Sequence, residues 1–103
     1  MLRTYLEGWQ NRDKQKILIC CHDNIELMDW HGKYLTKKEM IETIVDDWDR
    51  QQWFGLYDPK IMIDGNKATV NIGVARGKSY IGLTLQILRE NQQWLILKHQ
   101  YHF

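Results

Sequence analysis

The fold is decided by residues 60–74, which read KIMIDGNKATVNIGV. From Ala68 to Val74 an apolar residue occupies every second position, and Ile61 and Ile63 keep the same period before the turn. Asp64-Gly65-Asn66 between these two runs is a strong hairpin signal. A period of two is typical of strands with one buried face, so this stretch predicts two antiparallel strands joined by a tight turn.

The same pattern continues to the end of the chain. Arg76-Gly77-Lys78 reads as a second turn, and Glu90-Asn91-Gln92 reads as a third. Between them lies an alternating run, and after them comes a last strand that begins near Trp94 and ends at Phe103. The sequence therefore predicts a meander of four consecutive antiparallel strands. The apolar positions of the middle run are Ile81, Leu83, Leu85 and Ile87.

The first half of the chain is helical. One helical face is marked by residues spaced i, i+3, i+4 and i+7, and Asn11-Arg12-Asp13 ends that helix. Asp13 can cap a second helix, whose apolar stripe runs from Ile17 to Cys21. The two adjacent cysteines are therefore expected to be free thiols on this helix. The face of the first helix consists of Leu2, Tyr5, Leu6 and Trp9.

A strand and a third helix follow. Residues 24–30 read as the strand, and Trp30-His31-Gly32-Lys33 reads as a turn. Thr36-Lys37-Lys38-Glu39 is a capping box, in which Thr36 and Glu39 satisfy each other's backbone amides. The third helix is expected to run to about residue 50. The order of elements predicts one α+β domain over residues 1–103, with three helices packed on a curved antiparallel sheet that closes into a cone.

Composition limits the classes of partner. The chain has 103 residues, of which 44% are hydrophobic, which is enough for one packed core. Fourteen basic and 13 acidic side chains give a net charge of +1, which argues against nucleic acid or an anionic membrane as the partner. No apolar run reaches the roughly 20 residues of a membrane span. The N-terminal residues lack the apolar stretch of a signal peptide, so the expected location is cytoplasmic.

The polar face of the predicted sheet carries few charges. A sheet face that is neither core nor strongly charged is often an interface. We therefore expect a homodimer that forms through this outer face, and a simple solvated face is the alternative. The polar residues on it are Thr69, Asn71, Tyr80, Thr84 and Gln86.

The order of helix, helix, strand, helix and four-strand meander resembles the nuclear transport factor 2-like superfamily. Residues 5–13 look like its first helix and turn, and residues 23–44 are similar to the first strand and third helix of its SnoaL-like branch. Residues 93–100, QWLILKHQ, look like the closing strand of that branch. The resemblance covers nearly the whole chain. It implies a cone-shaped α+β barrel with an internal ligand pocket and frequent homodimers, but it implies no single reaction.

Strand parity selects the residues expected inside the cone. Asp29 shares a side with Leu27 on the first strand, and His99 and Tyr101 share a side with Leu97 on the last strand. Asp29, His99 and Tyr101 are therefore the candidate catalytic residues. Asp29 or His99 would move a proton, and Tyr101 would donate to a developing oxyanion. The residues expected to line the pocket are Trp9, Leu27, Trp48, Trp53, Leu83 and Leu97.

The same residues also have plain structural explanations. Asp29 stands beside a turn that it can cap. His99 and Tyr101 can be core residues that satisfy each other. His99 and His102 point to opposite faces of a strand, so no metal site is expected, and no cofactor is expected either.

Three functions remain open at this point. The first is a small-molecule-binding domain with an apolar internal pocket. The second is a cofactor-free lyase or isomerase, of the polyketide cyclase or ketosteroid isomerase type, that uses the three candidate residues. The third is a protein–protein interaction domain. The chain offers only one carboxylate that is expected inside, which favours the first.

Overall fold

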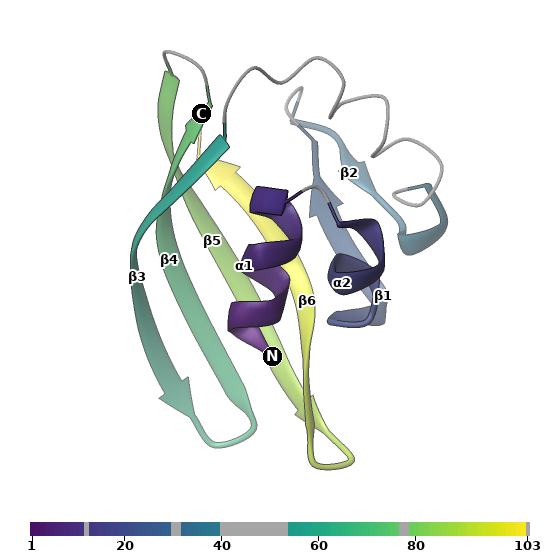
Figure 1. Cartoon of the computed structure of the whole chain (residues 1–103). Helices are drawn as coiled ribbons and strands as arrows, with labels where there is room; N and C mark the ends of the chain where they lie inside the picture. Colours follow the sequence, from purple (N-terminus) through teal and green to yellow (C-terminus); the bar gives the residue numbers. More distant parts are fainter. Residues whose placement is uncertain (12, 30–31, 40–53, 77–78, 103) are drawn as a thin grey trace.

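The computed structural model describes residues 1–11, 13–29, 32–39, 54–76 and 79–102. It confirms the α+β class, with helices over one face of a curved sheet (Figure 1). Residues 37–39 begin a third helix, and its further course lies outside the described residues. The elements are α1 (Leu2–Asn11), α2 (Lys14–Leu18), β1 (Cys21–Met28), β2 (Tyr34–Leu35), β3 (Phe54–Asp64), β4 (Lys67–Arg76), β5 (Ser79–Glu90) and β6 (Gln93–His102).

The sheet has the strand order β2-β1-β6-β5-β4-β3. The predicted meander from β3 to β6 is confirmed, since each of these strands pairs antiparallel with the next. Two features differ from the prediction. β1 runs parallel to β6, because the long connection after β1 returns the chain to the far edge of the sheet before the meander starts. The sheet is also open, with β2 and β3 as edges among the described strands, so it does not close into a cone.

The hairpin turns follow the sequence signals. β3 ends at Asp64 and β4 begins at Lys67, with Gly65 at a φ of 61° between them. Asn91 and Gln92 connect β5 to β6 at φ values of 50° and 63°. Positive φ at both central residues matches the right-handed twist of the paired strands. Two of the three predicted turns are therefore confirmed, and residues 77 and 78 of the third lie outside the described part.

The start of the sheet was wrongly predicted. β1 begins at Cys21, three residues earlier than expected, because α2 ends at Leu18 after five residues. The cysteines therefore lie in a turn and at the start of a strand rather than on a helix. Both thiols are free and buried, and burial raises the pKa of Cys21 to about 12, so this thiol is an unreactive core group. β2 was not predicted, since two residues carry no periodic signal.

Both predicted helix caps are present. The backbone amide of Lys16 donates to Asp13 Oδ1 at 3.3 Å. The Thr36 amide donates to Glu39 Oε1 and the Glu39 amide donates to Thr36 Oγ1, each at 3.2 Å. These hydrogen bonds from Thr36 lower the pKa of Glu39, because they favour the carboxylate form. The capping box fixes the point where the chain leaves β2 and enters the third helix.

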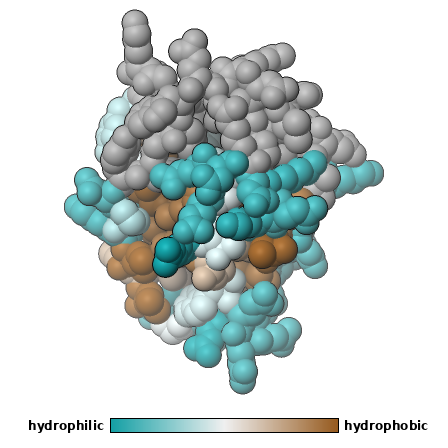
Figure 2. Space-filling view, viewed as in Figure 1, coloured by the Kyte–Doolittle hydropathy of each residue, from teal (hydrophilic) through white to brown (hydrophobic). Residues whose placement is uncertain are grey.

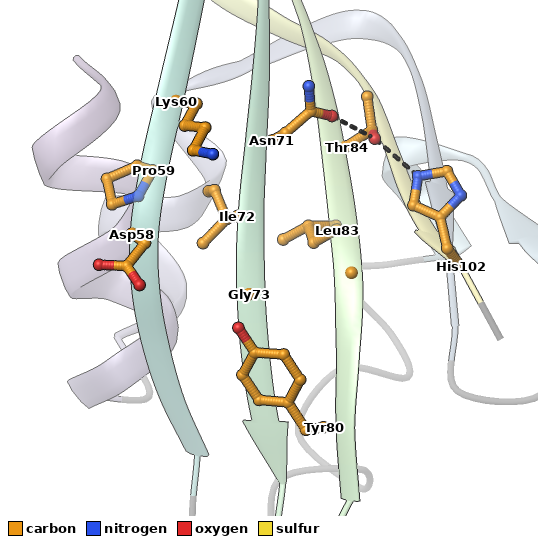
Figure 3. A pocket seen from close by; sticks show the side chains of 11 residues that line it. Asp58, Pro59, Lys60, Asn71, Ile72, Gly73, Tyr80, Leu83, Thr84 and His102 are labelled. Atoms are coloured by element: carbon orange, nitrogen blue, oxygen red, sulfur yellow. Dashed lines mark hydrogen bonds between the residues drawn. The ribbon is translucent and has the colours of Figure 1, made fainter.

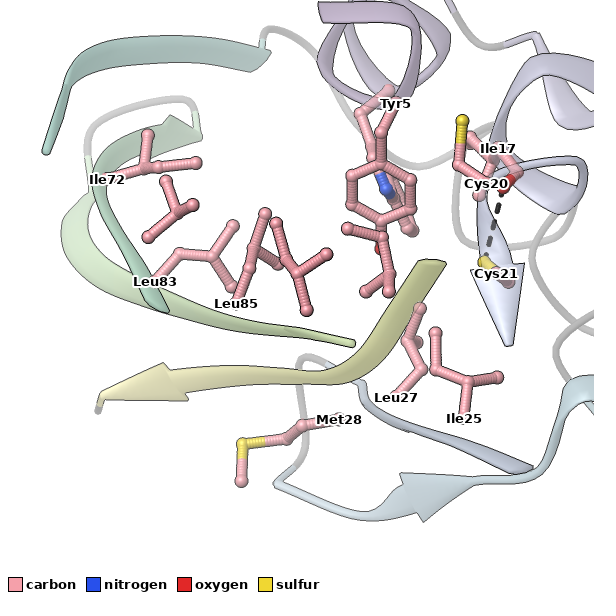
Figure 4. Packing of buried hydrophobic residues seen from close by; sticks show 14 of the residues in the cluster. Tyr5, Ile17, Cys20, Cys21, Ile25, Leu27, Met28, Ile72, Leu83 and Leu85 are labelled. Carbon is pink, nitrogen blue, oxygen red and sulfur yellow. Dashed lines mark hydrogen bonds between the residues drawn. The ribbon is translucent and has the colours of Figure 1, made fainter. Parts of the chain in front are cut away.

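The core lies between α1, α2 and the inner face of the sheet (Figure 4). Alternate residues of β4 and β5 point into it, as the period of two predicted. α1 is held close to α2 at Gly8, where an added Cβ would lie 2.9 Å from Ile17 Cγ1 and 3.1 Å from the Ile17 nitrogen. The fully buried side chains are Tyr5, Ile17, Val70, Val74, Leu83, Leu85, Ile96 and His99.

Replacing Gly8 by alanine is expected to lower the free energy of unfolding by about 1–3 kcal/mol. The new methyl group presses on the buried Ile17, and this overpacking outweighs the roughly 1 kcal/mol that alanine gains in helix propensity. Gly73→Ala is the matched control. Its Cβ would meet the hydroxyl end of Tyr80, which is 66% exposed and can move into solvent. Urea unfolding followed by circular dichroism measures both, and an equal loss in the two variants would contradict this account.

Candidate functional site

Tyr5 and His99 form a polar pair inside the core. Tyr5 Oη lies 2.8 Å from His99 Nδ1, and both side chains are 0% exposed. Tyr5 comes from α1 and His99 from β6, so the hydrogen bond joins the helical layer to the sheet across 94 positions of sequence. Tyr5 was expected on the buried face of its helix, but it was not expected at the site.

Two more aromatic rings surround this pair. Trp9 follows Tyr5 by one turn of α1, and its ring centroid is 5.2 Å from that of His99. Tyr101 follows His99 by two positions on β6, and its ring meets the imidazole edge-on at 4.8 Å. Tyr5 and His99 are also edge-to-face, at 6.0 Å. We call Tyr5, Trp9, His99 and Tyr101 the aromatic cluster, and its geometry is the one that aromatic rings prefer in cores.

The aromatic cluster is electrically neutral. Burial lowers the pKa of His99 to about 3, because the imidazolium ion cannot be hydrated there. Burial also raises the pKa of Tyr5 well above its ordinary value. At neutral pH the site therefore holds an uncharged imidazole and an uncharged phenol. It suits a neutral polar group much better than an ion.

His99 Nε2 is a buried polar atom without a hydrogen-bond partner. A neutral imidazole carries one proton on its two nitrogens. When the Tyr5 hydroxyl donates to Nδ1, the proton is on Nε2, which is then an N–H donor. When Nδ1–H donates to the hydroxyl, Nε2 is an acceptor. In either tautomer one polar atom of His99 is left unsatisfied, and such buried atoms are uncommon in folded proteins.

Asp29 lies at the end of β1 and holds the turn that follows. Its Oδ1 accepts a hydrogen bond from the Lys33 amide at 2.9 Å, and its backbone amide donates to the Lys33 carbonyl at 2.8 Å. Gly32 completes the turn at a φ of 82°. Neither nitrogen of His99 is hydrogen-bonded to Asp29, since Nδ1 meets Tyr5 and Nε2 has no partner. The turn-capping interpretation of Asp29 agrees with these contacts.

A β-bulge changes the parity of β6. Gln86 pairs with Lys98, but the next residue, Ile87, pairs with Ile96, so Leu97 is left between them. Ile96 is 0% exposed on the inner face, whereas Leu97 lines a hollow on the outer face. The prediction that Leu97 lines the interior is therefore wrong. Gly82, in the middle of β5, keeps regular pairs with Gly73 and His102.

The other predicted lining residues are placed as follows. Leu27 pairs with His99 in the sheet, and Leu83 pairs with Tyr101. Both leucines are buried in the core with Trp9, which belongs to the aromatic cluster. Trp48 and Trp53 lie outside the described residues. The role of these side chains in contacting a ligand stays a prediction.

The outer face of the sheet carries an open groove of about 670 Å³ (Figure 3). Its floor contains a chain of hydrogen bonds: Thr84 Oγ1 donates to Asn71 Oδ1 at 2.8 Å and lies 2.6 Å from His102 Nε2. The hydroxyl of Tyr80 reaches over Gly73 at one end, and Lys60 stands on the flank. The expected polar, weakly charged outer surface is thus present, and its side chains are partly tied to one another.

The described part of the chain offers neither a metal-binding cluster nor a membrane-spanning helix. It holds no group of three or more histidine, cysteine, aspartate or glutamate side chains that could bind a metal ion. Among the same residues, no helix is long and apolar enough to cross a membrane.

No family model and no curated protein matches the sequence. Solved structures do match. An NTF2-like protein of unknown function from Pseudomonas putida KT2440 superposes with a TM-score of 0.79 at 14% identity, over 97% of this chain and 79% of the other. A proposed dehydratase of the NTF2-like family from Streptomyces avermitilis gives 0.80 at 10% identity, over 97% and 88%. A proposed ketosteroid isomerase from Shewanella frigidimarina gives 0.79 at 14% identity, over 98% and 90%.

The chain therefore has the nuclear transport factor 2-like fold. These identities show the fold alone. The SnoaL-like branch is not named among these neighbours, so that finer assignment stays a prediction.

Proposed function

We propose that residues 1–103 form one cytoplasmic domain that binds a neutral, apolar small molecule on the inner face of the sheet. The observation that carries this proposal is the unsatisfied Nε2 of the fully buried His99. A ligand with one hydrogen-bonding group would satisfy that atom, and the three aromatic rings around it would pack on the rest of the ligand. An apolar hollow of about 190 Å³ lies on the same face of the sheet, but it is lined by Ile61, Ile63 and their neighbours and not by the aromatic cluster.

The test uses three bicyclic probes of similar shape: 2-naphthol, naphthalene and 2-naphthoate. The hydroxyl of 2-naphthol can donate or accept, so it suits either tautomer of His99. We expect 2-naphthol to bind up to about tenfold more tightly than naphthalene, which is the usual value of one hydrogen bond. The charged 2-naphthoate should bind most weakly because the site is neutral. Tryptophan fluorescence titration measures all three.

His99→Asn is the matched variant. Asparagine places a polar atom near the position of Nδ1, where Tyr5 lies, but has none at the position of Nε2. The preference for 2-naphthol over naphthalene should disappear in this variant. The proposal fails if none of the probes binds, if 2-naphthoate binds best, or if the preference survives in His99→Asn.

The second candidate is a cofactor-free lyase or isomerase that uses Asp29, His99 and Tyr101. It is favoured by the two structural neighbours described as a proposed dehydratase and a proposed ketosteroid isomerase. Such chemistry requires removal of a proton next to a carbonyl. Incubating 2-tetralone with the protein in D2O and following its α-protons by NMR tests this directly. Exchange above background that is lost in Asp29→Asn supports catalysis, and background exchange alone supports binding without catalysis.

The expected homodimer is part of the proposal. The weakly charged outer face around Thr84 and Tyr80 supports pairing of two such faces. Gln86→Arg places a charge in the middle of this face and should weaken the dimer by about tenfold or more. Gln15→Arg makes the same change at an exposed position of α2 and should have no effect. Analytical ultracentrifugation measures both, and equal behaviour of the two variants would argue for a solvated outer face.

A further inference from the structure

The second half of β3 is an apolar edge. Ile61, Met62 and Ile63 are 53%, 63% and 68% exposed, although they lie in a strand. Among the residues that the structure describes, β3 pairs only with β4. Its other side therefore presents backbone N–H and C=O groups that another strand can pair with. Hydrophobic side chains gather at this edge of the molecule (Figure 2).

The middle of β3 is interrupted in a way that opposes such pairing. Asp58 has a φ of 51°, and the register with β4 shifts between Tyr57 and Lys60. Pro59 lies within this irregularity and has no N–H to donate. Proline and bulges are the usual devices by which proteins block an edge strand. Residues 60–64 lie beyond this irregularity and pair with β4 without a break, so they offer one continuous stretch of edge to a partner strand.

Residues 60–64 read Lys-Ile-Met-Ile-Asp. Two copies of this segment that run in opposite directions therefore place complementary side chains opposite one another. In an antiparallel pair centred on Met62, Lys60 faces Asp64 of the second copy and Asp64 faces Lys60. Ile61 faces Ile63 of the second copy in the same way. Opposite charges and apolar residues placed directly across antiparallel strands both stabilise a sheet. We propose that a second copy of the chain docks here, edge to edge, and continues the sheet across a two-fold axis.

The faces of the strand agree with this register. Ile61 and Ile63 pair with the inward Val70 and Ala68, and both line the apolar hollow on the inner face. Four isoleucines would meet on the inner side of the joined sheet, and the two charge pairs would lie on the outer side with Met62. An unrelated extended peptide would need to match the same order of charges, whereas a second copy has it already. This contact is separate from the outer face proposed above.

Cross-linking at Met62 tests the pairing. Residues directly opposite in an antiparallel pair have Cα atoms about 4.5–5.5 Å apart, which a disulfide can bridge. Met62→Cys should therefore form a covalent dimer under mild oxidation, which a non-reducing gel detects. Thr69→Cys is the control, since Thr69 lies beside Met62 on β4 but one strand in from the edge. The two native thiols are buried and present in both variants.

Charge reversal in the Met62→Cys background tests the register. Lys60→Glu and Asp64→Lys each place like charges opposite one another, so each alone should cross-link about tenfold more slowly. A mixture of the two variants restores opposite charges in both pairs and should cross-link at the original rate. Lys60 faces the uncharged Asn71 on β4, so Lys60→Glu remains informative if Asp64→Lys does not fold.

Three results would overturn the proposal. These are no cross-link at position 62, equal cross-linking at positions 62 and 69, and no effect of Lys60→Glu. A dimer in solution that does not cross-link at position 62 would assign dimerisation to the outer face instead. Failure of the naphthol test has no bearing on this result, because the edge contact does not involve His99.

Discussion

Lowering the pH from about 7 to about 5 should reduce the free energy of unfolding by about 2 kcal/mol, because the unfolded chain gains a proton that the folded chain cannot take up. The pKa of His99 is about 3 in the folded state, where burial opposes its charge. In the unfolded state it returns to about 6.5. The unfolded state thus binds more protons between these values. The stabilisation is complete above about pH 6.5 and is lost as the pH falls toward 3.

His99→Asn is the control for this prediction. It removes the titrating group and leaves the other three histidines in place, so the loss of about 2 kcal/mol between about pH 7 and 5 that His99 causes should disappear. Chemical unfolding at several pH values, fitted with a common slope, measures the difference between the two proteins. The same pH dependence in both would show that other groups cause it, and that His99 is hydrated in the folded state.

Among single substitutions, truncation of Tyr5 should cause the largest loss in the free energy of unfolding. Tyr5→Ala is expected to lower the free energy of unfolding by roughly 3–5 kcal/mol, as for other large buried aromatic residues. Tyr5→Phe keeps the ring and removes only the hydroxyl. It should lower the free energy of unfolding by about 1–3 kcal/mol, because His99 Nδ1 is left buried and unpaired.

The pair of Tyr5 variants separates packing from hydrogen bonding. Tyr80→Phe is the matched control, since Tyr80 is 66% exposed, and it should change stability by less than about 0.5 kcal/mol. Thermal and urea unfolding measure all three. A Tyr5→Phe variant as stable as the original protein would mean that the contact with His99 adds nothing to stability.

The meander could be predicted from the sequence because its signals are local. Alternation along β4 and β5 needs only neighbouring residues, and the turns at Gly65 and Asn91 lie directly between the alternating runs. The helix caps at Asp13 and Thr36 are local as well. In each case the physical cause lies within about four residues of the feature that it produces.

The bulge in β6 could not be predicted in the same way. Residues 94–97 read Trp-Leu-Ile-Leu, so all four are apolar and the stretch has no polar position to mark its outer face. An unbroken period of two therefore predicts that Leu97 lies on the inner face. The pairing with β5 turns Ile96 toward the inner face. This pairing depends on the tertiary structure and not on the neighbouring sequence.

The candidate site was predicted only in part. Parity placed His99 and Tyr101 on the inner face, and the structure puts them there. Asp29 was also counted inward, but the amide of Lys33 engages its carboxylate in the turn. Tyr5 was missed as the partner of His99, because helical periodicity identifies a buried face and does not say which distant residue that face meets.

The parallel pairing of β1 with β6 has a consequence for how the chain folds as it is synthesised. β1 leaves the ribosome early, yet its partner, β6, is the last strand made. The hairpins from β3 to β6 close through contacts near in sequence, whereas β1 and Tyr5 contact residues about 70–95 positions later. The growing chain can pair its first strand with β2, but the edge of β1 that faces β6 stays without its partner until the last strand is made. Unpaired strand edges of this kind make partly synthesised chains prone to aggregation.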